Sequence, residues 1–168
     1  MKEIVVGSLT FSFPEPWLPS ALDTWRFYLR HFQGMFAGIK AVDIVAVDGR
    51  DATWLIEVKD YRRHRREKAI DLVEEVAKKA AHSLGCLRAA AVRATVSDEQ
   101  TVAAASLTTA TLRVVLHLEQ PRTHSKFFPR VFDPREVEQK LRRIVRPIDP
   151  QARVAETGAM HNLPWSVT

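Results

Sequence analysis

Residues 43–59 read DIVAVDGRDATWLIEVK, and this stretch places three charged side chains in otherwise apolar strands. IVAV and TWLI are rich in β-branched and aromatic residues, and the DGRD between them is a turn sequence, so the stretch predicts an antiparallel hairpin. Side chains alternate along a strand, which puts Glu57 and Lys59 on one face. Counting back from the turn places Asp43 level with Glu57.

These charged residues need a compensating partner, because an unpaired buried charge costs several kcal/mol. A divalent metal ion supplies it. Mg²⁺ prefers a few carboxylate oxygens, keeps several waters and can take a backbone carbonyl, here that of Val58. Such a metal activates water and shields a phosphate, while Lys59 orients the nucleophile or stabilises charge on the phosphoryl oxygens. The pattern predicts a Mg²⁺ or Mn²⁺ site at Asp43, Glu57 and the Val58 carbonyl.

Asp43 on one strand and Glu57-Val58-Lys59 on the next resemble the signature of the PD-(D/E)XK nuclease superfamily, which has the restriction endonuclease-like fold. The resemblance covers roughly residues 20–120 and implies an α/β protein with a mixed β-sheet flanked by helices. It also implies hydrolysis of nucleic-acid phosphodiesters with Mg²⁺. In that reaction Asp43 and Glu57 would hold the metal and Lys59 would be the catalytic lysine.

The chain departs from the family pattern in two places. Many members carry a glutamate in the first helix, whereas the helix expected over residues 20–33 offers only Asp23, with Glu15 just upstream. The residue before Asp43 is Val42 rather than proline. The first departure leaves open how many metal ions bind and whether the protein is active.

The whole chain, 1–168, is expected to be a single nuclease-like domain with its core at about 20–120 and a C-terminal helix and tail at 133–168. Apolar periodicity and capping residues predict the other elements. These are one or two strands in 3–13, a helix at 20–33 capped by Ser20, a hairpin strand at 38–47, a helix at 71–94, a helix at 98–109 with a capping box at Ser97 and Gln100, a strand at 111–120, a helix from Asp133 to Arg146, and a short strand in the tail.

A basic segment, YRRHRREK, follows the motif directly. Its arginines are candidates for holding a phosphate backbone beside the metal site, and a solvated basic loop is the alternative. The candidates are Arg62, Arg63, Arg65 and Arg66. Asp60 points to the opposite strand face from Glu57 and is expected to pair with an arginine of this loop.

Glu75, Lys79 and His82 share one face of the long helix. Lys78 or Lys79 could assist at the site, and Lys79 is counted with the nucleic-acid-binding candidates, although an exposed, ion-paired face is the favoured interpretation. The segment HSKFFPRVF (124–132) mixes cations with aromatic residues in an apparent loop, which also suits nucleic-acid contact.

Other residue types exclude other classes of enzyme. The six histidines include no HxxxH pair, and no GxSxG elbow or Gly-rich phosphate loop occurs in the sequence. His117, inside an apolar strand, is expected to be a hydrogen-bonded core residue. The single cysteine, Cys86, excludes an intramolecular disulfide and fits a cytoplasmic location. The net charge of +5 favours a polyanionic partner, and no stretch has the length of a membrane span.

Three hypotheses follow from the sequence. The first is a metal-dependent nuclease acting on nucleic acid, with DNA favoured over RNA. The second is a catalytically inactive nucleic-acid-binding or scaffold protein of the same fold. The third treats Glu57 and Lys59 as a simple ion pair on an edge strand, away from Asp43. A module of this size often works as a homodimer or with a partner subunit, and no membrane association is expected.

Overall fold

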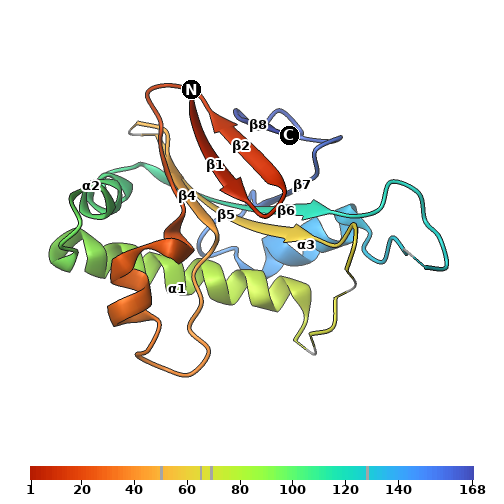
Figure 1. Ribbon diagram of the computed structural model, residues 1–168, viewed down its shortest axis with the longest axis horizontal. Coiled ribbons are helices and arrows are strands. Elements are labelled where there is room, and N and C mark those ends of the chain that lie inside the picture. Colours follow the sequence, from red (N-terminus) through yellow and green to blue (C-terminus); the bar gives the residue numbers. More distant parts are fainter. Residues whose placement is uncertain (50, 65, 69, 128) are drawn as a thin grey trace.

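The computed structural model describes residues 1–49, 51–64, 66–68, 70–127 and 129–168, and these residues form three layers (Figure 1). The central layer is a five-stranded mixed sheet in the order β3 (Leu18–Ser20), β4 (Ile44–Val47), β5 (Ala52–Asp60), β6 (Thr111–Glu119) and β7 (Arg153–Ala155). A three-stranded antiparallel sheet covers one face, in the order β1 (Lys2–Val6), β2 (Leu9–Phe13) and β8 (Ser166–Val167). Helices cover the other face, so the predicted α/β class with a mixed sheet flanked by helices is confirmed.

The hairpin of β4 and β5 forms as predicted, with Ile44 opposite Ile56. Its first strand is shorter than the predicted 38–47, because β4 begins only at Ile44. The backbone just before it is bonded to side chains instead of a strand: the Val42 N–H donates to Ser83 Oγ at 2.9 Å. On its other side β5 pairs in parallel with β6 along its whole length. The strand that carries Glu57 is therefore internal to the sheet.

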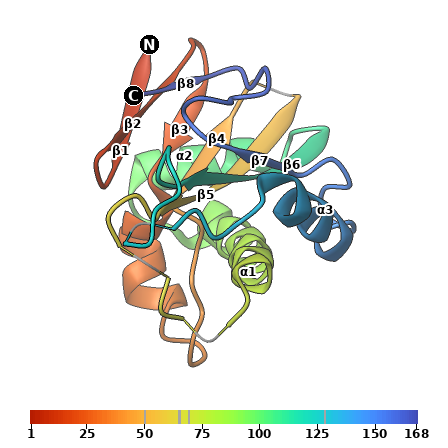
Figure 2. The same ribbon diagram turned by 90° about the vertical axis from the view of Figure 1, so that its right-hand side faces the viewer.

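Three α-helices follow the hairpin: α1 (Leu72–Arg93), α2 (Ser97–Ser106) and α3 (Pro134–Ile144). The predicted long helix is confirmed as α1. It begins where Asp71 accepts hydrogen bonds from the N–H groups of Val73 and Glu74, which have no partner within the helix. Figure 2, viewed along α1, shows α1 and α3 on the opposite side of the central sheet from the β1–β2 hairpin.

Three details of the predicted helix ends are wrong. Ser97 does not form a capping box, because it is itself helical and Val96 occupies the N-cap position of α2. The same helix ends at Ser106 instead of reaching the predicted residue 109. Helix α3 starts at the predicted Asp133 cap but ends at Ile144. The earlier end has a steric reason, since Arg146 precedes Pro147 and a residue before proline is driven away from helical geometry.

The helix expected over residues 20–33 is also wrong in its first half. Ser20 ends strand β3, and its hydroxyl accepts a 2.7 Å hydrogen bond from the Trp25 indole instead of capping a helix. The chain then makes a 3-10 turn, η1 (Leu22–Thr24), and a π-helical turn, η2 (Tyr28–Phe32). Trp25 and Tyr28 are buried in the core, as the density of aromatic residues predicts.

Alternation along the central strands divides the buried side chains into two cores. Leu55 and its neighbours pack against α1, α2 and α3, whereas Ile56 packs against Phe11 and Phe13 of the three-stranded sheet. Glu57 shares the face of Leu55, so the candidate site lies on the helical side of the sheet. Among the described residues, no helix is both long and apolar enough to cross a membrane.

Candidate functional site

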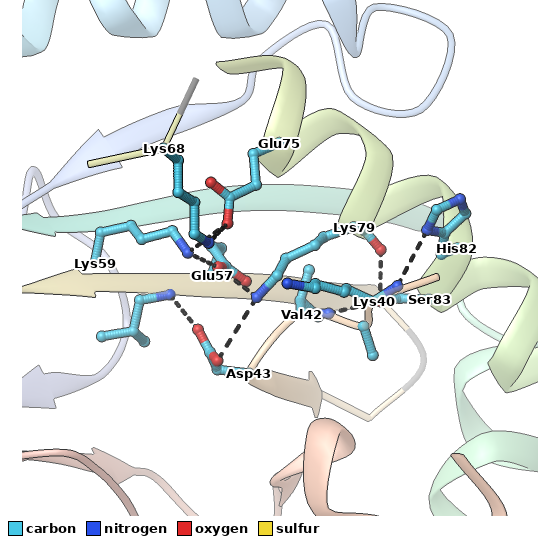
Figure 3. Close-up of polar contacts among 12 residues, drawn as sticks. Lys40, Val42, Asp43, Glu57, Lys59, Lys68, Glu75, Lys79, His82 and Ser83 are labelled. Atoms are coloured by element: carbon cyan, nitrogen blue, oxygen red, sulfur yellow. Dashed lines mark hydrogen bonds and ion pairs between the residues drawn. The ribbon is translucent and has the colours of Figure 1, made fainter. Parts of the chain in front are cut away.

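Asp43, Glu57 and Lys59 meet on the helical side of the central sheet (Figure 3). Extending the β4–β5 pairing by one step beyond Ile44 and Ile56 puts Asp43 level with Glu57, which confirms the register counted from the turn. Asp43 Oδ2 accepts a 2.6 Å hydrogen bond from the Val58 N–H. The carboxylate therefore continues the contact between the two strands where their backbone pairing has stopped. The hypothesis of an isolated ion pair on an edge strand is wrong.

Glu57 is completely buried and is shared by two lysines. Its Oε1 lies 2.6 Å from the ammonium of Lys59 and 2.6 Å from that of Lys79. Its Oε2 is buried and has no hydrogen-bond partner in the described part of the chain. Burial raises the pKa of Glu57 to about 7 with help from Asp43, against the opposing attraction of Lys79 and Lys59.

The charge state of Lys59 follows from the same contacts. Burial lowers the pKa of the Lys59 ammonium, yet the Glu57 and Glu75 carboxylates together raise it above its ordinary value. The ion pair therefore raises the pKa of Lys59 but does not lower the pKa of Glu57 below its ordinary value. The reason is that Glu57 is the more deeply buried partner and also faces Asp43. Lys59 is therefore a fixed positive charge at neutral pH and suits charge stabilisation rather than proton abstraction.

Helix α1 contributes Glu75 and Lys79 to the site, so the interpretation of their face as an exposed one is wrong. Glu75 is buried and Lys79 is largely covered; its ammonium also lies 4.0 Å from Asp43 Oδ1. Both side chains come from one face because they are four residues apart on the helix. His82, one turn further, is half-buried and accepts a 3.4 Å hydrogen bond from the Lys40 N–H.

Glu75 forms ion pairs with three cationic side chains. Its Oε1 lies 3.0 Å from Lys59 Nζ and also contacts Lys68, while its Oε2 lies 2.8 Å from the Arg66 guanidinium. Burial alone would raise the pKa of Glu75, but these cations together lower it to about 2. Sequence reasoning missed this role. The only signal for it was the shared helix face of Glu75 and Lys79.

Asp23 provides an acidic group close enough to Asp43 for their charges to interact. It lies half-buried in η1, the segment where the resemblance leads one to look for a glutamate. Burial raises the pKa of Asp23, and the negative charge of Asp43 raises it further. The two aspartates therefore interact electrostatically.

The donor atoms suit a hard cation, although the site is not a ready-made metal cage. In the described ranges, no three His, Cys, Asp or Glu side chains converge as a metal-binding group. Asp43, the unpartnered Oε2 of Glu57 and the Val58 carbonyl are all oxygen donors, which Mg²⁺ prefers. The carbonyl faces Asp43, because the N–H and C=O of one strand residue point to the same edge. The Lys79 ammonium lies against both carboxylates and would have to move to admit a cation.

Two arginines of the basic loop after β5 form ion pairs with carboxylates of the protein itself. Arg62 lies 2.6 Å from Asp60, which confirms the predicted pair, and Arg66 is bound to Glu75. Arg63 is exposed to solvent. Arg65 lies outside the described residues. Arg63 is thus the described arginine of this loop best placed to meet an external phosphate.

His117 and Cys86 are both structural residues, as predicted. His117 is buried, and its Nε2 lies 2.9 Å from Glu119 Oε1. Cys86 is buried in α1, and burial raises the pKa of its thiol to about 12. A thiol of that kind is not a nucleophile at neutral pH.

Fold and site together define a mixed-sheet α/β protein with a buried carboxylate–lysine cluster beneath a long helix. In sequence, the chain is similar to a cysteine–tRNA ligase of Neisseria meningitidis (serogroup A / serotype 4A, strain DSM 15465 / Z2491), with 29% identity over 160 residues. The match covers 77% of this chain and 23% of the Neisseria protein, so the chain spans less than a quarter of that protein's length. No family model matches the chain. No solved structure matches it either.

Proposed function

We propose that the protein is a metal-dependent nuclease of the PD-(D/E)XK superfamily, hydrolysing nucleic-acid phosphodiesters. One observation carries the proposal: Asp43, just before β4, converges with Glu57 and Lys59 of β5 at a point where Glu57 Oε2 is buried without a partner among the described residues. The order of the elements supports a restriction endonuclease-like core. The aspartate precedes β4, the Glu-Val-Lys lies on β5, and α1 followed by α2 leads to the parallel strand β6.

The roles of the residues follow from their charges and contacts. Asp43, Glu57 and the Val58 carbonyl would hold Mg²⁺ or Mn²⁺, which when bound acts as a Lewis acid on the phosphate and on water. Lys59 stays positively charged and stabilises negative charge on the phosphoryl oxygens. In the net reaction the oxygen of water bonds to phosphorus, one phosphorus–oxygen bond to a sugar breaks, and the leaving sugar oxygen takes up a proton from water.

The proposed partner is nucleic acid, with DNA favoured over RNA. The net charge of +5 and the exposed Arg63 support a polyanionic partner. The name of the Neisseria protein refers to tRNA, so tRNA belongs in a substrate screen beside DNA. We also propose that the protein is cytoplasmic and acts as a homodimer or with a partner subunit. The free, buried Cys86 is compatible with the reducing cytoplasm.

The test combines metal binding with cleavage. Calorimetric titration with Mn²⁺ and Mg²⁺ is followed by incubation with single-stranded DNA, duplex DNA and tRNA. We expect Asp43→Asn to lose metal binding, and Lys59→Ala to keep it but to cleave about a hundredfold more slowly, as when one stabilising charge is removed from a transition state. Asp51→Asn and Lys140→Ala, which change exposed residues away from the candidate site, are the matched controls. Equal cleavage by the wild type, Asp43→Asn and Lys59→Ala would refute the proposal.

The second candidate is an inactive nucleic-acid-binding or scaffold protein of the same fold. The observation that favours it is the Lys79 ammonium, 2.6 Å from Glu57 Oε1, which supplies a positive charge to the buried carboxylate without a metal. This function predicts salt-sensitive binding of nucleic acid that is unchanged by EDTA, with no cleavage in the screen above.

A further inference from the structure

We infer that the protein binds single-stranded nucleic acid in a groove between the loop after β5 and the segment after β6, beside the candidate catalytic residues. The inference rests on the proposed function and specifies its substrate. The groove is a cavity of about 280 Å³. Its wall includes Tyr61, Arg63, His64, Lys68, Phe127 and Phe132, and we call it the loop groove.

Aromatic rings form one part of the loop groove. Tyr61 and Phe132 pack against each other with ring centroids 5.8 Å apart and an interplanar angle of 35°. Phe127 is 78% exposed, which is unusual for a phenylalanine in a folded protein. An exposed aromatic face costs free energy in water and gains it by stacking on a nucleobase, whatever the identity of the base.

Positive charge lies beside the aromatic rings in this lining, together with the uncharged Gln120, Pro129 and Val131. The described lining residues include arginine, histidine and lysine side chains and no carboxylate. Arg63 and His64 are both exposed to solvent. A cationic wall beside aromatic rings is complementary to a strand whose phosphates and bases are both accessible.

The loop groove adjoins a second cavity next to the candidate site. This cavity has a volume of about 140 Å³ and shares Lys68 with the loop groove. Its lining includes Lys40, Lys78 and Lys79, together with Glu75, whose charge is balanced by its contacts with Lys59, Arg66 and Lys68. Lys79 contacts Glu57 directly. A track rich in cations therefore leads from the aromatic rings to the carboxylates.

The exposed aromatic rings favour a single strand over a duplex. In a duplex each base is stacked between its neighbours and its faces are unavailable, whereas an unpaired base can turn out of the strand and stack on a side chain. Phe127 can thus take a base while the phosphates follow Arg63, Lys68 and Lys79 towards Glu57.

The test is fluorescence anisotropy with a labelled single-stranded oligothymidylate, and with a duplex of the same length, in EDTA. We expect the single strand to bind more tightly than the duplex. Phe127→Ala should weaken single-strand binding at least fivefold, the loss of one stacked base. Arg63→Ala should weaken it and reduce the slope of log affinity against log salt by about 0.7. Matched controls are Phe36→Ala, at a ring that is 69% exposed outside the groove, and Arg88→Ala on the exposed surface of α1.

Two results would overturn the inference: a Phe127→Ala variant that binds like Phe36→Ala, or a duplex that binds as tightly as the single strand. Thermal melting of each variant checks that the fold is intact. Because EDTA removes metal ions, this binding does not depend on cleavage. If the wild type binds the single strand in the loop groove but shows no metal-dependent cleavage, the proposed function alone is refuted. If the protein cleaves nucleic acid but Phe127→Ala has no effect on binding, the inference alone is refuted.

Discussion

Glu75 contacts three cationic side chains, and only one of them, Lys59, belongs to the motif that the sequence singles out. Spacing within β5 was enough to place Glu57 and Lys59 together, because strand geometry fixes which side chains share a face. No comparable rule places a helix residue against a strand. From the sequence, Glu75 and Lys79 are expected to be an ordinary solvated pair, since surface helices commonly carry such pairs. The orientation of α1 is what brings them into the site.

Glu75→Gln should destabilise the protein at pH 7 by about 2 kcal/mol, because the cations around it lose their partner while remaining covered. The folded-state pKa of Glu75 is about 2, below its ordinary value of 4.5. Its contribution to stability is therefore present above pH 4.5 and is lost as the pH falls towards 2. Urea unfolding of the wild type and the variant at a series of pH values from 7 downward measures this.

The matched control is Glu74→Gln, which removes an exposed carboxylate from the position just before Glu75 in the same helix. It should change stability by only a few tenths of a kcal/mol, as expected for a charge near a helix N-terminus. A difference between wild type and Glu75→Gln that stayed constant down to pH 2 would contradict the assignment.

At the scale of elements, the sequence predicted β5, β6, α1 and α3 well and the segment from Ser20 to Val42 poorly. The first group has a clear hydrophobic period, and α1 and α3 also carry Asp caps. The segment from Ser20 to Val42 follows tertiary contacts instead: the Arg26 N–H bonds to Glu99 of α2, and the Val42 N–H bonds to Ser83 of α1. Contacts between residues so far apart in the chain are not encoded in local periodicity.

The N-cap of α1 offers a test of how the helix positions its site residues. Asp71→Ala should cost about 1 kcal/mol, because two backbone N–H groups lose their acceptor. Asp133→Ala removes the equivalent cap of α3 and should cost a similar amount. Only Asp71→Ala should reduce the hydrogen-exchange protection of the Glu75 amide, which lies in the first turn of α1. Equal protection of Glu75 in both variants would show that packing alone fixes this turn.

At the scale of the whole molecule, the central sheet is covered on both faces, by helices on one side and by the three-stranded sheet on the other. The sequence predicted the helical layer and the strands near the N-terminus. It did not predict that β8 would pair with β2, where Phe11 lies opposite Val167. Two residues at the far end of the chain carry no strand signal that could reveal their partner.

Phe13→Ala should destabilise the protein by about 3–5 kcal/mol, because the ring is completely buried between the two sheets and its loss leaves a cavity. Phe36→Ala, at an exposed ring, should change the free energy of unfolding by less than about 0.5 kcal/mol. Urea denaturation measures both. A small effect of Phe13→Ala would mean that the three-stranded sheet adds little to the stability of the central one.

The crowding of cations around Glu75 makes the positive charges there partly interchangeable. Arg66 and Lys59 are well covered, with 9% and 13% of their side chains exposed, whereas 47% of the Lys68 side chain is exposed. If Lys68 swings out to an incoming anion, the other two still neutralise the buried carboxylate, so the desolvation penalty of an orphaned charge does not arise. Lys68 can therefore contact an external anion while Lys59 stays bound to Glu57.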